Sequence, residues 1–169
     1  VGEVGVDLEQ VEQIAEHEHG AVQHLVAGDR RPHVGGVLDL LAGLAESDLQ
    51  RVFDERITLM PGARTLIATM RAAGALTALV SGGFSFFTSR VAATVGFDVN
   101  RANTLEVVDG RLTGRVVGPI LGREAKLAAL EHYRGERGLA AAATLAVGDG
   151  ANDLAMIKAA GLGVAYRAK

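Results

Sequence analysis

The sequence predicts an α/β fold with a mainly parallel sheet, because short apolar runs alternate with stretches of helical pattern. "ALTALV" (75–80), "TLAVG" (144–148) and "GVAY" (163–166) have the length and apolar character of buried strands. Strands separated by helices build βαβ units, whose strands pair in parallel. The Asp109-Gly110 pair in "NTLEVVDGRLTGRVVG" adds an antiparallel hairpin, because this dipeptide favours a tight turn between strands.

The predicted helices follow from apolar residues at helical spacing. "MPGARTLIATMRAAG" places Pro and Gly before such a stretch and Gly74 after it, which is the order that helix ends favour. In "FSFFTSRVAATVGF", the residues Phe87, Val91 and Val95 recur at helical spacing. We expect helical regions, in chain order, at 37–57 (two short helices), 60–74, 84–97, 122–138 and 152–161.

The amino-acid composition excludes several classes of function. The 169 residues suffice for one domain. The net charge of −3 does not favour binding to nucleic acid or to a membrane surface, both of which are negatively charged. The absence of cysteine excludes disulfides, a thiol nucleophile and cysteine–metal sites. The acidic start "VGEVGVDLEQVEQ" does not fit a secretory signal, and no apolar run reaches spanning length. We expect a cytoplasmic monomer or homodimer without nucleic-acid or membrane partners.

Polar residues follow two of the predicted strands. Ser81-Gly82-Gly83 comes directly after the strand at 75–80, and "GDGAND" (148–153) begins at the last residue of the strand at 144–148. In open parallel sheets, ligands bind beyond the carboxyl ends of the strands. Taken singly, each loop fits a structural role, as a tight turn or as a helix entry capped by Asp149 or Asn152. Their occurrence together favours a binding site.

The residue types in these loops suit a phosphorylated ligand. The Ser81 hydroxyl and the N–H groups of Gly82 and Gly83 are expected at a helix N-terminus, where they would form an anion cradle. Asp149 and Asp153 offer the carboxylate oxygens that Mg²⁺ binds together with substrate phosphate. Lys126, the one lysine before residue 145, would neutralise the phosphate charge. A solvent-exposed helix lysine is the structural alternative for Lys126.

The sequence resembles the phosphoserine phosphatase branch of the haloacid-dehalogenase-type phosphatases. The resemblance covers roughly residues 40–169 and is carried by "LVSGGFSFF", "NTLEVVDGRLTGRVVGPI", "AKLAAL" and "VGDGANDLAMIKAAGLGVAYRAK". It implies a Rossmann-like core with a β-hairpin insertion and a truncated or altered helical cap. On this basis we expect an atypical N-terminal segment at 1–36, a cap remnant at 37–60 and the phosphatase core at 61–169.

The resemblance also implies an activity and a role for each site residue. The activity is the Mg²⁺-dependent hydrolysis of O-phospho-L-serine to L-serine, a step of serine biosynthesis, through an aspartyl-phosphate intermediate. Ser81, Gly82 and Gly83 would hold the phosphoryl group, and Lys126 would balance its charge. Asp149 would bind Mg²⁺, Asp153 would support the metal directly or through water and Lys126, and Asn152 would contact phosphate or substrate.

One family feature has no clear counterpart in this sequence. Members begin with a strand that ends in Asp-x-Asp-Ser/Thr, whose first Asp is the nucleophile and whose second is the general acid and base. The nearest stretch is "VGVDLEQV", which offers Asp7 as nucleophile and Glu9 as its partner. Two hypotheses therefore stand: a working phosphatase, or a non-catalytic relative that binds a phosphorylated small molecule. With the motif unmatched, we expect little turnover and a helical or irregular segment at 1–36.

Overall fold

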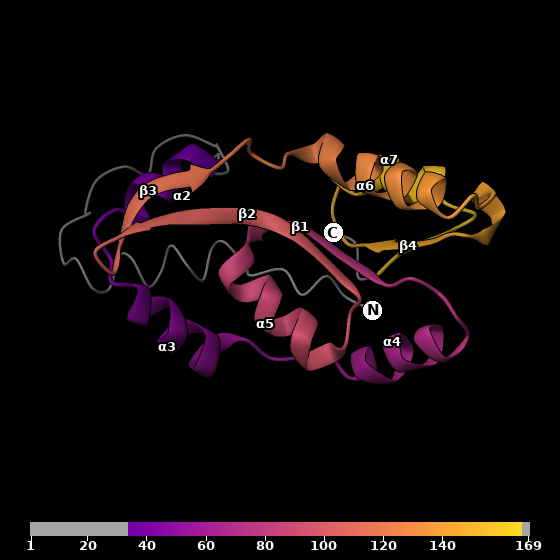
Figure 1. The fold of residues 1–169 in the computed structure, drawn as a ribbon, viewed down its shortest axis with the longest axis horizontal. Helices are drawn as coiled ribbons and strands as arrows, with labels where there is room; N and C mark the ends of the chain where they lie inside the picture. Colours follow the sequence, from indigo (N-terminus) through magenta and orange to yellow (C-terminus); the bar gives the residue numbers. More distant parts are fainter. Residues whose placement is uncertain (1–33, 167–169) are drawn as a thin grey trace. The chain divides into compact units, whose positions relative to one another are not determined.

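A computed structural model describes residues 34–166 (Figure 1), so the predictions for 1–33, including Asp7 and Glu9, lie outside the described residues. The described chain forms two compact units. The core unit contains Leu59–Asn103 and the residues from Ile120 onward. The hairpin unit contains residues up to Thr58 together with Thr104–Pro119. The predicted division at 36/37 and 60/61 stays a prediction.

The core unit alternates helices with short strands, which confirms the α/β class. Its elements are α4 (Ala63–Ala72), β1 (Ala78–Phe84), α5 (Ser85–Val95), the first half of β2 (Val99–Val108), α6 (Arg123–Glu136), a 3₁₀ turn (Ala141–Ala143), β4 (Leu145–Gly148), α7 (Leu154–Ala159) and β5 (Leu162–Ala165). None of the helices in the described part of the chain is long and apolar enough to cross a membrane.

The strands form two sheets within residues 34–166, where one mainly parallel sheet was expected. β1 pairs in parallel with β2, and the outer half of β2 pairs antiparallel with β3 (Arg111–Val117), which makes a mixed three-stranded sheet. β4 and β5 form a separate parallel pair. β1 and β4 are therefore not hydrogen-bonded neighbours among the described strands. Apolar runs reveal that strands exist, but they carry no information on which edges pair.

The packing of α5 shows how the pattern of the sequence becomes a core. Phe87, Val91 and Val95, predicted to share a helix face, are all buried, and α5 packs against β1 (Figure 1). From β1 the residues Leu79 and Phe84 are buried as well. Full burial of such side chains stabilises the fold by about 1.5–3 kcal/mol each. This apolar layer fixes β1, from which the site described below extends.

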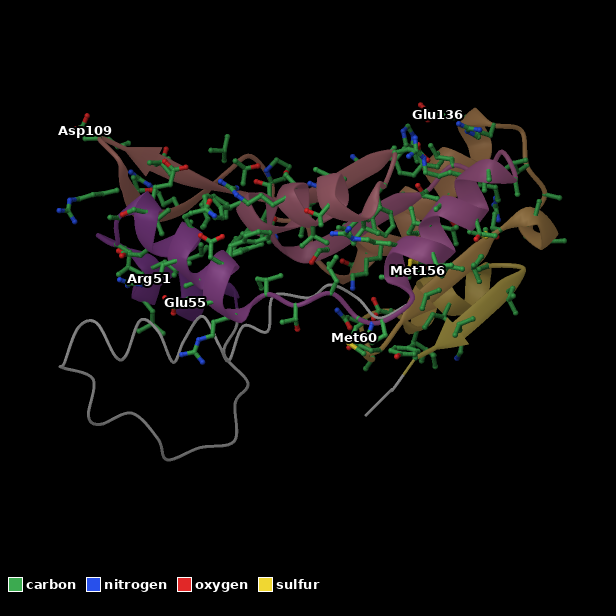
Figure 2. The ribbon with its side chains drawn as sticks, turned by 90° about the horizontal axis from the view of Figure 1, so that it is seen from below. Arg51, Glu55, Met60, Asp109, Glu136 and Met156 are labelled. Carbon is green, nitrogen blue, oxygen red and sulfur yellow. The ribbon has the colours of Figure 1, made fainter. Side chains whose placement is uncertain are left out.

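The hairpin unit joins α2 (Val34–Leu41) and α3 (Glu46–Arg56) to the predicted hairpin, which is confirmed. Figure 2 shows Asp109 at its tip. Asp109 has φ +52° and Gly110 has φ +74°, which are the left-handed values of the tight hairpin turn. The loop after α2 pairs with β3, because Gly43 N–H donates to the Leu112 carbonyl at 2.8 Å. The buried leucines of this unit are Leu38, Leu41, Leu44, Leu49, Leu105 and Leu112.

Candidate functional site

Ser81-Gly82-Gly83 forms a bulge inside β1. Val80 pairs with Arg101 and Phe84 pairs with Asn103, so three residues of β1 lie opposite one residue of β2. We expected the strand to end before Ser81 and the glycines to open a helix; instead β1 continues to Phe84 and α5 begins at Ser85. The pattern missed this because serine and glycine give no apolar signal, although glycine within a strand often marks a bulge.

The bulge is held by two side chains. Ser81 is buried, and its Oγ accepts a hydrogen bond from the Gly83 N–H at 3.0 Å. Asn103 donates from Nδ2 to the Gly82 carbonyl at 2.7 Å. Sequence reasoning did not single out Asn103, because one carboxamide beside a hairpin signal is ordinary in a strand. The bulge is therefore a fixed segment of backbone at the end of β1.

A buried ion pair joins Lys126 to the "GDGAND" loop, the two other parts of the predicted site. Lys126 on α6 lies with its Nζ 2.5 Å from Oδ1 of Asp153, and only 4% and 1% of these side chains are exposed. The other oxygen, Oδ2 of Asp153, accepts the N–H groups of Asp149 and Gly150, each at 3.1 Å. The structure thus brings Lys126 and the "GDGAND" loop together, and the solvent-exposed alternative for Lys126 is wrong.

Asp153 also rules out the helix-cap explanation of this loop. It is the residue that precedes α7, yet its carboxylate makes no capping bond to that helix and turns back to the loop. Neither Asp149 nor Asn152 caps α7, and both are exposed. The loop can close this tightly because Gly148 has no side chain: a Cβ there would lie 2.5 Å from Cγ of Asp153.

Both loops continue from strands that line one cavity. A cavity of about 510 Å³ in the core unit is lined by residues of β1 and β4 and by Lys126 and Asp153. Val80 and Val147 both line this cavity. Ser81 is the next residue after Val80, and Asp149 comes two residues after Val147. That the Ser81 and Asp149 side chains converge on one ligand stays a prediction.

The donors present fit a magnesium ion that is completed by substrate. Within residues 34–166 no three carboxylate or imidazole side chains gather into a ready-made cluster. The Asp149 carboxylate is exposed and, among the described residues, makes no ion pair. Mg²⁺ commonly takes one or two carboxylates, several waters and substrate phosphate, so Asp149 suits it. Both oxygens of Asp153 are already engaged, which fits a supporting role better than direct coordination.

Comparison with known proteins finds a family and a consistent set of relatives. The family model described as haloacid dehalogenase-like hydrolase matches residues 25–158. A protein of Streptomyces coelicolor named phosphoserine phosphatase is 50% identical over 130 residues, which cover 77% of this chain and 32% of that protein. One of the same name from Idiomarina loihiensis is 48% identical over 129 residues, 76% of this chain and 58% of its own length.

Solved structures described as phosphoserine phosphatases also align with this chain. A structure described as a phospho-aspartyl intermediate analogue of phosphoserine phosphatase aligns with a TM-score of 0.76 at 36% identity, covering 99% of this chain and 77% of its own. A probable phosphoserine phosphatase from Vibrio cholerae aligns with a TM-score of 0.76 at 34% identity, over 99% of this chain and 51% of its own. The chain spans about a third to three-fifths of the two curated relatives described above.

Proposed function

We propose, since this chain belongs to the haloacid dehalogenase-like hydrolase family, that it hydrolyses O-phospho-L-serine to L-serine and phosphate with the help of Mg²⁺. The observation that carries the proposal is the buried Lys126–Asp153 pair, tied by hydrogen bonds to the backbone of the Asp149 loop. The relatives named phosphoserine phosphatase support this substrate. The reaction would serve serine biosynthesis, and its cytoplasmic setting stays a prediction.

The described residues would bind and orient the phosphoryl group. The Gly82 N–H and the Ser81 hydroxyl would donate to its oxygens, and Gly83, whose N–H is held by Ser81 Oγ, would let the backbone approach the phosphate closely because it has no side chain. Lys126 would neutralise part of its negative charge from a buried position, where electrostatic stabilisation is strongest. Asn152, exposed in the same loop as Asp149, would contact phosphate or substrate.

Asp149 would hold the magnesium ion, and Asp153 would fix the loop that presents it. The bound ion would supply Lewis-acid polarisation of a phosphoryl oxygen. Asp153 orients both neighbours at once, since it accepts hydrogen bonds from two loop N–H groups and pairs with Lys126. Removing such a supporting group typically lowers activity or metal affinity by about 10- to 100-fold.

The nucleophile of the proposed reaction is an aspartate. Its carboxylate oxygen would attack phosphorus while the bond to the serine oxygen breaks, and that oxygen would leave with a proton from an acid. Water would then cleave the aspartyl phosphate and release inorganic phosphate. Asp7 is the aspartate that the sequence offers for this step, with Glu9 as the acid, and both lie outside the described residues.

The test is phosphate release from O-phospho-L-serine by the unchanged chain, with Mg²⁺ and with excess EDTA. The unmatched motif alone predicts little turnover, whereas the relatives support an active enzyme. We therefore expect turnover that needs the metal and falls by at least about 100-fold in Asp149→Asn and in Lys126→Met. Asp7→Asn should abolish it if Asp7 is the nucleophile.

Two outcomes would contradict the proposal. Turnover unchanged by EDTA and by Asp149→Asn would remove the magnesium role. Binding of inorganic phosphate without any turnover would instead support the non-catalytic hypothesis. Asp54→Asn is the matched control, because Asp54 lies on α3 in the hairpin unit and should leave turnover as it is.

A further inference from the structure

Asn103 is a buried polar residue to which the roles above give no part in the reaction. Only 3% of it is exposed. It is the residue of β2 that pairs with Phe84, directly beyond the Ser81-Gly82-Gly83 bulge. A carboxamide buried so completely needs hydrogen-bond partners, because the loss of its bonds to water is otherwise uncompensated.

Its two partners come from segments that are distant in sequence. Nδ2 of Asn103 donates to the Gly82 carbonyl at 2.7 Å, and Oδ1 accepts the Leu121 N–H at 2.7 Å. One contact needs a donor and the other an acceptor, so the orientation of the amide is fixed. Leu121 lies two residues before α6, the helix that carries Lys126. One side chain therefore connects the bulge to the entrance of that helix.

The connection lies where the chain leaves the core unit and re-enters it. The chain leaves the core unit after Asn103 and returns to it at Ile120. The residues at both ends of this excursion, Asn103 and Leu121, are thus fixed to each other and to Gly82. The bulge is also close to Leu121 through its backbone, since a Cβ on Gly82 would lie 3.7 Å from the Leu121 carbonyl oxygen.

We propose that Asn103 is a positioning residue that keeps the phosphate-binding bulge and the start of α6 in one fixed geometry. This inference rests on the proposed function, because it concerns how Gly82, Gly83 and Lys126 meet the same phosphoryl group. Displacement of a reacting or binding group by about 1 Å lowers rates by up to about 100-fold. The effect of Asn103 is indirect, since it acts through the backbone of the bulge and of residue 121.

Two substitutions separate the two contacts. Asn103→Asp keeps an acceptor for the Leu121 N–H but places an oxygen against the Gly82 carbonyl. Asn103→Ala removes both contacts. We expect kcat/KM on O-phospho-L-serine to fall by about 10- to 100-fold in both variants. Hydrogen exchange of the Leu121 amide should accelerate in Asn103→Ala and stay slow in Asn103→Asp. The dissociation constant of inorganic phosphate, measured in Mg²⁺, should rise in both.

Thr77→Val is the matched control for a merely structural role. Thr77 is 5% exposed, and its hydroxyl donates to Asp98 Oδ2 at 2.8 Å at the opposite end of the same strand pair. This variant should lower the unfolding temperature and leave kcat/KM unchanged when all chains are folded. Equal losses of kcat/KM in Thr77→Val and the Asn103 variants would overturn the positioning role.

Failure of the inference can be told apart from failure of the proposed function. An active unchanged chain with equally active Asn103 variants contradicts only the inference. An unchanged chain that neither releases phosphate nor binds it contradicts the proposed function and the inference with it. If the chain binds phosphate without turnover, unchanged phosphate affinity in Asn103→Asp and Asn103→Ala would overturn the inference alone.

Discussion

Asp153 shows how one buried side chain can hold a lysine and a loop in a fixed arrangement. Its carboxylate accepts from Lys126, from the Asp149 N–H and from the Gly150 N–H, so a buried charge is matched by charge and by directed hydrogen bonds. Removing one member of a buried ion pair typically costs about 3–5 kcal/mol, because the other charge is left unpaired. The arrangement therefore couples the position of Lys126 to the shape of the loop.

Asp98 gives a prediction about acid stability at the same scale. Its carboxylate accepts the backbone N–H of Thr77 at 2.9 Å and the Thr77 hydroxyl at 2.8 Å, and it faces Nε of Arg71 at 2.8 Å. These groups, the Thr77 N–H first, hold the pKa of Asp98 below its usual range. Because the pKa is lower in the folded state, the ionised Asp98 carboxylate stabilises the fold above about pH 4, and this stabilisation is lost as the pH falls and the carboxylate is protonated.

We therefore expect the free energy of unfolding to decrease from about pH 5 downward, and to decrease less steeply in Asp98→Asn. Urea denaturation at pH 7, 5 and 3 measures this. Some acid dependence should remain, because the Thr113 hydroxyl and then Arg115 also lower the pKa of Glu106. Identical pH slopes in Asp98→Asn and the unchanged chain would contradict the assignment.

At the scale of the element, the turn from β4 to α7 depends on the missing side chain of Gly148. A Cβ there would lie 2.5 Å from Cγ and 2.6 Å from Oδ2 of Asp153, which is closer than real contacts allow. Gly148→Ala should push Asp153 away from Lys126, lower turnover on O-phospho-L-serine by up to about 100-fold and destabilise the fold.

Gly135→Ala is the control for that substitution. Gly135 lies within α6, and nothing is within 4 Å of the place its Cβ would take. Alanine there should raise the free energy of unfolding by about 0.5–1 kcal/mol, because glycine is the weaker helix former. Kinetics and urea denaturation of both variants check the pair. Unaltered turnover in Gly148→Ala would show that Asp153 does not need its observed position.

Across the molecule, the sequence was informative where local chemistry decides structure. Apolar periodicity predicted α5 with its buried residues Phe87, Val91 and Val95, and the Asp109-Gly110 turn predicted the hairpin. The "GDGAND" loop and Lys126 were singled out by residue type, and the structure places Lys126 against Asp153 of that loop. The family resemblance is confirmed by the matched family model.

The sequence failed where pairing across space decides structure. It did not show that β1 continues through Ser81-Gly82-Gly83 as a bulge, because the register shift depends on β2. It did not single out Asn103, whose importance arises from two partners far away in sequence. The division of the described strands into two sheets was equally hidden, since an apolar strand does not specify its neighbour.

We propose that the β1 bulge and the "GDGAND" loop bind one phosphoryl group. The most direct measurement is an NMR titration of the unchanged chain with inorganic phosphate in Mg²⁺, following the amides of Gly82, Gly83, Asp149 and Gly150. We predict that all four amides shift with a single dissociation constant, and that Lys126→Met weakens binding at all of them together. Shifts confined to one loop, or different constants for the two loops, would contradict a shared site.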